Sequence, residues 1–114
     1  MIKIKIYKDE NDSILEYETM GHAKDARVCS AVSVITQAPI LTLLENFKLD
    51  GGKFGYAIED AYLFVKLPFN NKITNVLMDN MLLTLKELER LYPDEIKLIE
   101  VKIETCDVQI ASKK

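Results

Sequence analysis

Apolar and polar residues alternate along two stretches at the start of the chain. Over residues 2–7 the apolar side chains fall at every second position, and residues 14–20 form a second extended stretch. A period of two is typical of half-buried β-strands. The polar run 9–13 between the two stretches has the composition of a turn. We therefore expect the chain to open with a β-hairpin.

The apolar period changes to that of a helix after this hairpin. Apolar residues recur three and four positions apart from Val28 to Phe47, on both sides of Pro39. Proline has no N–H to donate within a helix, so we expect one helix with a kink at Pro39. Two further extended stretches, residues 54–58 and 62–67, predict a second hairpin.

A second helix and a last strand complete the pattern. Asn70 or Asn71 can cap this helix. Its expected apolar face comprises Val76, Leu77, Met81, Leu85 and Leu88. Apolar and charged residues then alternate over 99–104, as in a half-buried strand.

The order of elements is therefore ββαββαβ. This order predicts the α+β fold class, with a single-layer sheet and two helices packed on it. We expect one domain over residues 1–114, in which 105–114 form a flexible tail.

Composition and charge narrow the classes of function. The 114 residues carry 18 acidic and 15 basic side chains, a formal net charge of −3, so we expect no direct binding to nucleic acid. No apolar run reaches the roughly 18 residues of a membrane span, and the alternating residues after Met1 do not resemble a signal peptide. These features predict a cytoplasmic protein with reduced thiols and no membrane partner.

The only histidine, His22, stands seven residues before Cys29. Gly21 can release the preceding strand sharply into a loop, which leaves His22 at the strand end. Cys29 then falls in the first turn of the next helix, where free N–H groups and the helix dipole stabilise a thiolate. Because the connection can fold back, the two side chains could form a base and nucleophile pair.

Each of these residues also has a simpler interpretation. A cysteine in an amphipathic helix is usually a small core residue, and a single histidine beside a loop is usually a surface residue. Asp25 could orient His22 or cap the helix, and Ser33 could contact the sulfur or bond to a helix carbonyl. A zinc site is not expected because the loop offers too few ligands. The second cysteine, Cys106, has no base near it in the sequence.

The motif Gly21-His22-Ala23, followed by Asp25 and by Val28-Cys29-Ser30-Ala31-Val32-Ser33, resembles the ribosomal processing cysteine proteases of the Prp (YsxB-like) family. Members of that family carry Gly-His-Ala at the end of the second strand and Cys-x-x-x-Ser at the head of the first helix. The resemblance spans about residues 1–104. In this chain the loop before Cys29 is shorter than in many members, and Asp25 stands four residues before the cysteine instead of three.

The resemblance implies a bacterial cysteine endopeptidase that removes the short N-terminal extension of a large-subunit ribosomal protein and cuts after an aromatic residue. By the same resemblance, Cys29 is the nucleophile, His22 is the general base, and Ser33, Asp25 and Gly21 support them. It also implies an apolar pocket beside Cys29, no cofactor or metal, and a homodimer. The alternative, from another class, is a non-catalytic ribosome-associated module that binds a peptide as an added strand.

Overall fold

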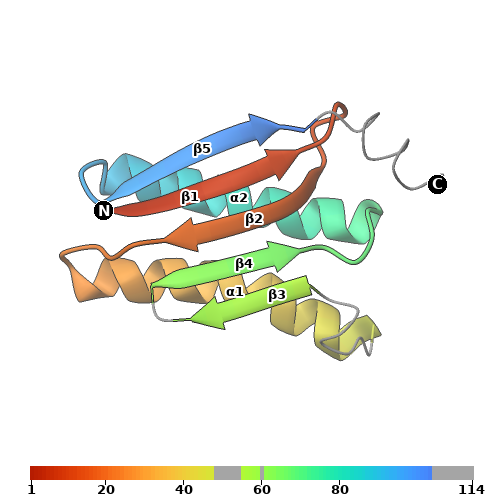
Figure 1. The fold of residues 1–114 in the computed structure, drawn as a ribbon, viewed down its shortest axis with the longest axis horizontal. Helices are drawn as coiled ribbons and strands as arrows, with labels where there is room; N and C mark the ends of the chain where they lie inside the picture. Colours follow the sequence, from red (N-terminus) through yellow and green to blue (C-terminus); the bar gives the residue numbers. More distant parts are fainter. Residues whose placement is uncertain (48–54, 60, 104–114) are drawn as a thin grey trace.

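One five-stranded sheet carries both helices on the same face (Figure 1). The computed structural model describes residues 1–47, 55–59 and 61–103. The elements are β1 Ile2–Lys8, β2 Ile14–Met20, α1 Ala26–Phe47, β3 Gly55–Glu59, β4 Tyr62–Lys66, α2 Lys72–Leu91 and β5 Ile96–Lys102. The predicted order and the α+β class are confirmed. Phe54, Cys106 and the expected tail 105–114 lie outside the described residues.

The strand order is β3-β4-β2-β1-β5. Both predicted hairpins are present as antiparallel pairs, whereas β5 lies parallel to β1, with Ile2 opposite Ile96. A parallel pair needs a crossover connection, and α2 supplies it. The start of β1 and the turn between α2 and β5 therefore meet at one end of the sheet (Figure 1).

The core lies between the sheet and the two helices. Tyr17 of β2 is completely buried there, and its hydroxyl donates a hydrogen bond of 2.7 Å to the carbonyl oxygen of Thr36 in α1. Burial raises the pKa of this hydroxyl, which keeps it a donor. Pro39 of the same helix has no N–H to donate to the carbonyl oxygen of Ile35, which is adjacent in the chain to the carbonyl that Tyr17 bonds.

α1 is long and apolar enough to cross a membrane by length and composition, with a mean hydropathy of 1.5. Its buried side chains pack on the sheet, as expected for the core helix of a globular domain. The buried set is Val28, Val32, Thr36, Pro39, Ile40 and Leu43.

α2 begins at the second of the two predicted caps. The side chain of Asn71 accepts the N–H of Thr74, whose hydroxyl accepts the N–H of Asn71 in return, both at 2.9 Å. The predicted apolar face is wrong at Val76, which is 68% exposed, while Met78 and Leu82 are buried. Apolar residues lie on both sides of this helix, so their spacing alone does not select the buried side.

β5 also presents a different face to the core from the one its alternation indicates. Its register with β1 turns Ile96 and Leu98 inward, and Glu100 follows them toward α2. Glu100 pairs with Lys8 at 2.6 Å and with Lys86 of α2 at 3.7 Å. Glu100 and Lys102 of the alternating run are still exposed, and Ile99 and Val101 are only half-buried.

Candidate active site

Gly21 turns the chain at the end of β2. Its φ of +97° lies in the region that side chains avoid, and a Cβ added there would lie 2.4 Å from the carbonyl oxygen of Met1. Its N–H donates to the carbonyl oxygen of Ala61 at 2.9 Å, and the carbonyl oxygen of His22 accepts a hydrogen bond of 2.7 Å from the Met1 nitrogen. Hydrogen bonds from two sides thus fix the strand end that carries His22. The chain leaves β2 in a sharp turn at Gly21, as the sequence predicts.

Cys29 lies in the first turn of α1, as the sequence predicts. Its Sγ accepts a hydrogen bond of 3.1 Å from the N–H of Ala23, and the thiol is 3.7 Å from the carbonyl oxygen of the same residue. The side chain is half-buried. The sulfur therefore lies at a helix start with a backbone N–H directed at it.

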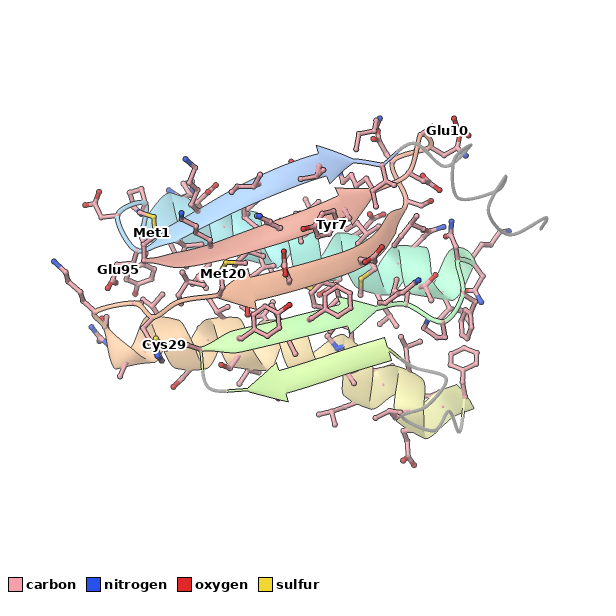
Figure 2. The ribbon with its side chains drawn as sticks, in the orientation of Figure 1. Met1, Tyr7, Glu10, Met20, Cys29 and Glu95 are labelled. Carbon is pink, nitrogen blue, oxygen red and sulfur yellow. The ribbon has the colours of Figure 1, made fainter. Side chains whose placement is uncertain are left out.

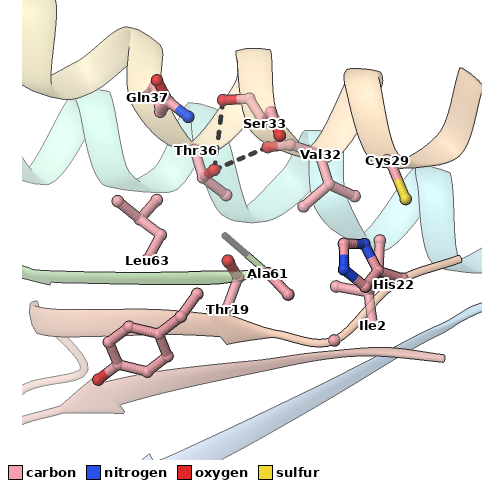
Figure 3. Close-up of a pocket in the computed structure, with 12 residues that line it drawn as sticks. Ile2, Thr19, His22, Cys29, Val32, Ser33, Thr36, Gln37, Ala61 and Leu63 are labelled. Carbon is pink, nitrogen blue, oxygen red and sulfur yellow. Dashed lines mark hydrogen bonds between the residues drawn. The ribbon is translucent and has the colours of Figure 1, made fainter. Parts of the chain in front are cut away.

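His22 and Cys29 lie at the same end of one cavity, His22 from the strand end and Cys29 from the helix start (Figure 3). Among the described residues no hydrogen bond joins the imidazole to the sulfur. Catalytic pairs often tighten only when substrate binds, so this separation is compatible with proton transfer between them.

The cavity beside these two residues has a volume of about 250 Å³. Its lining is mixed instead of purely apolar, which corrects the expected apolar pocket. The residues that line it are Ile2, Thr19, Gly21, His22, Cys29, Val32, Ser33, Thr36, Gln37, Ala61, Tyr62 and Leu63. Ser33 and Gln37 follow Cys29 at intervals of four along α1, so helical spacing could have pointed to Gln37 as well as to Ser33.

Asp25 caps α1, which is one of its two predicted roles. Its Oδ1 accepts the N–H of Arg27 at 2.9 Å, and its carbonyl oxygen accepts the N–H groups of Val28 and Cys29. The Arg27 guanidinium is 2.8 Å from Oδ2, and its hydrogen bonds lower the pKa of the Asp25 carboxyl. Among residues 1–47 and 61–103 no hydrogen bond links Asp25 to the imidazole of His22.

Glu95, in the turn before β5, reaches this site although nothing in the sequence points to it. Its Oε1 accepts the N–H of Asp25 at 2.8 Å, across a separation of 70 residues. Its carbonyl oxygen accepts the N–H of Ile2 at 2.8 Å. Figure 2 shows Glu95 and Met1 at the same end of the sheet as Cys29.

No group of three or more His, Cys, Asp or Glu side chains that could hold a metal ion occurs within the described ranges.

A half-buried thiol at a helix start, beside an imidazole and a cavity on an α+β sheet, suits the class of cysteine peptidases. A family model described as cysteine protease Prp matches residues 1–97, and the chain belongs to that family. It is a cysteine peptidase, and this membership favours the enzyme over the non-catalytic peptide-binding module. No curated protein matches the chain.

Several solved structures share the fold. The essential ribosomal processing protease Prp from S. aureus, in complex with a covalently linked product peptide, is 20% identical, with a TM-score of 0.73, covering 88% of this chain and 99% of its own. The same protease with a substrate peptide is 16% identical, with a TM-score of 0.73 and the same coverage. SMU.848 from Streptococcus mutans is 17% identical, with a TM-score of 0.73, covering 90% of this chain and 96% of its own.

Proposed function

We propose that this peptidase removes the short N-terminal extension of a large-subunit ribosomal protein, cutting after an aromatic residue, with Cys29 as nucleophile and His22 as general base. The observation that carries the proposal is the thiol of Cys29 at the start of α1, beside His22 and open to a cavity. The S. aureus relative is described as a ribosomal processing protease and binds a substrate peptide, which supports this substrate class.

The reaction proceeds through a thioester. His22 takes the thiol proton, the sulfur of Cys29 forms a bond to the scissile carbonyl carbon, and an electron pair moves onto the carbonyl oxygen. When this intermediate collapses, the C–N bond breaks and His22 gives its proton to the leaving amine. Water then adds to the thioester with His22 as base, which releases the carboxylic acid and regenerates the thiol. No cofactor takes part in these steps.

The remaining predicted residues have supporting roles in this proposal. Gly21 places His22 at the strand end, Asp25 caps the helix that presents the thiol, and Ser33 lines the cavity. The N–H of Ala23 stabilises the thiolate through its hydrogen bond to the sulfur.

The cavity has room for an aromatic side chain next to the cleaved bond. An apolar cavity of about 150 Å³ holds benzene, and this one is larger, at about 250 Å³. Ile2, Val32 and Leu63 supply apolar wall for the ring. The side chains of Ser33 and Gln37 in α1 also line the cavity and can hydrogen-bond the peptide backbone.

The test is to incubate the purified protein with the extended form of the ribosomal protein from the same genome and to measure the product masses. We expect the wild type to cut at one bond after an aromatic residue, and Cys29→Ala and His22→Ala to lose at least about a hundredfold in rate. Cys106→Ala is the matched control and is expected to cut normally. Cleavage by Cys29→Ala at the wild-type rate would refute the proposed nucleophile.

We further propose that the enzyme acts in the cytoplasm as a homodimer. Apolar side chains stand exposed on both helices and offer surface for a second copy. They are Val34 and Leu41 in α1, with Ile73, Val76 and Leu83 in α2, each at least 50% exposed.

A further inference from the structure

We propose that Glu95 is a positioning residue for the peptidase reaction, because its carboxylate holds the loop that joins His22 to Cys29. The inference rests on the proposed function, since it takes Cys29 as the nucleophile. Among the described residues no hydrogen bond joins Glu95 to the thiol or to the imidazole. It acts through the backbone of Asp25.

The hydrogen bond from Asp25 to Glu95 is the last fixed point of the loop before α1. Two residues earlier, the N–H of Ala23 lies on the sulfur of Cys29. The carbonyl oxygen of Asp25 accepts the N–H groups of Val28 and Cys29, three and four residues later, at 3.0 and 3.3 Å. Movement of Asp25 would therefore disturb both the donor on the sulfur and the helical turn that carries it.

Glu95 is itself held in place. Its N–H donates to the carbonyl oxygen of Tyr92 at 3.0 Å, and its carbonyl oxygen accepts the N–H of Ile2 at 2.8 Å. The turn between α2 and β5 is thus hydrogen-bonded to β1. The Glu95 side chain therefore extends to the loop from a backbone that is fixed at both its N–H and its carbonyl oxygen. A contact from a rigid support fixes a catalytic group better than a contact from a mobile one.

The length of the Glu95 side chain and its negative charge are two possible reasons for its effect, and they predict different results for substitutions at this position. If Glu95 acts as a hydrogen-bond acceptor at a set distance, glutamine retains the function because its amide oxygen occupies the same position. Aspartate keeps the charge but is one methylene shorter, so it cannot span the 2.8 Å contact without movement of the backbone. If charge alone mattered, aspartate would retain the function and glutamine would lose it.

The experiment compares the wild type with Glu95→Ala, Glu95→Gln and Glu95→Asp, with Asp94→Ala as matched control because Asp94 is an exposed carboxylate next in the chain. Two rates are measured for each protein: cleavage of the extended ribosomal protein, and alkylation of Cys29 by iodoacetamide, followed by peptide mapping with Cys106 as internal reference. We expect kcat and the alkylation rate to fall about tenfold in the alanine and aspartate variants, with KM unchanged. The glutamine variant and Asp94→Ala should stay within about twofold of the wild type.

Wild-type rates in Glu95→Ala, or retained activity in the aspartate variant with loss in the glutamine variant, would overturn the inference. If the alanine variant does not fold, the comparison of glutamine with aspartate still decides between reach and charge. Failure of the wild type to cut the ribosomal protein would instead refute the proposed substrate. Alkylation needs no substrate, so the two failures are distinguishable.

Discussion

Gly21 occupies a position that no other residue type can fill without strain. Its positive φ disfavours any side chain, and a Cβ added there would lie 2.4 Å from the Met1 carbonyl oxygen. Strain of this kind costs about 1–3 kcal/mol, and here it falls directly before His22.

For Gly21→Ala we therefore expect the free energy of unfolding, measured with urea, to fall by about 2 kcal/mol and the cleavage rate to fall about tenfold or more. Ala61→Gly is the control, because Ala61 has a φ of +60° in the facing turn and glycine relieves that strain. Its stability is expected to stay within about 1 kcal/mol of the wild type. If the free energy of unfolding and the cleavage rate of Gly21→Ala equal those of the wild type, the backbone at Met1 moves to accept a side chain at little cost, and the prediction is wrong.

Single residues differ in how far the sequence could predict their roles. The spacing of His22 and Cys29 around a strand end and a helix start predicted that both line one cavity, but not that no hydrogen bond joins them among the described residues. Glu95 could not be found in this way, because a glutamate has no distinctive local pattern and its partner is 70 residues away. Only the tertiary fold makes that carboxylate an acceptor for the loop.

At the scale of elements, the first turn of α1 depends on its cap. Asp25→Ala removes the side-chain acceptor for the Arg27 N–H, so we expect a melting temperature lower by a few degrees and a several-fold slower cleavage. Asp25→Asn keeps an acceptor oxygen and should retain most of both properties. Equal loss in the two variants would assign the effect to the ion pair with Arg27 instead of the cap.

The cap also predicts a dependence on acid. Hydrogen bonds from Arg27 lower the pKa of Asp25 in the folded protein, so the ionised carboxylate stabilises the fold fully above its ordinary pKa. That contribution is lost as the pH falls through the lowered folded value. The small difference in melting temperature that remains between wild type and Asp25→Asn should therefore be constant at neutral pH and shrink as the pH falls below about 4, the ordinary pKa of an aspartate carboxyl. A difference that persists in acid would exclude the ionised form as its source.

The type and order of all seven elements could be predicted from the sequence. The buried faces of α2 and β5 could not. Val76 has the spacing of a core residue and is exposed, and the inward face of β5 begins with Ile96 and Leu98. Apolar residues occur on both sides of these elements. The register of β5 with β1 and the packing of α2 on the sheet decide which face is buried, and neither can be read from local periodicity.

At the scale of the whole molecule, β5 forms one edge of the sheet and α2 covers part of it. Glu89 accepts the N–H of Leu98 at 2.7 Å, so this edge donor is already satisfied by a side chain. Edge strands with free backbone groups pair readily with other chains. Glu89 thus disfavours the pairing of β5 with a strand of another chain.

We expect light scattering to give the wild type twice the mass of the 13.0 kDa chain, and Glu89→Ala to add larger species whose share rises with concentration. Glu87→Ala is the matched control on the same helix, because Glu87 pairs with Arg90 and has no hydrogen bond to β5 in the described part of the chain. Identical mass distributions for the two variants would contradict a protective role for Glu89.

The hydrogen bond between Ile2 of β1 and Glu95 in the turn before β5 joins the two ends of the domain, which affects when the site can form during synthesis on the ribosome. The loop that carries His22 is held by the Met1 nitrogen at one point and by Glu95 at another, and β5 pairs with β1 only after α2 has crossed the sheet. A nascent chain still inside the ribosomal exit tunnel at its β5 segment lacks both the pairing and the Glu95 contact. We therefore expect the loop before Cys29 to reach its final position only after the β5 segment has left the tunnel.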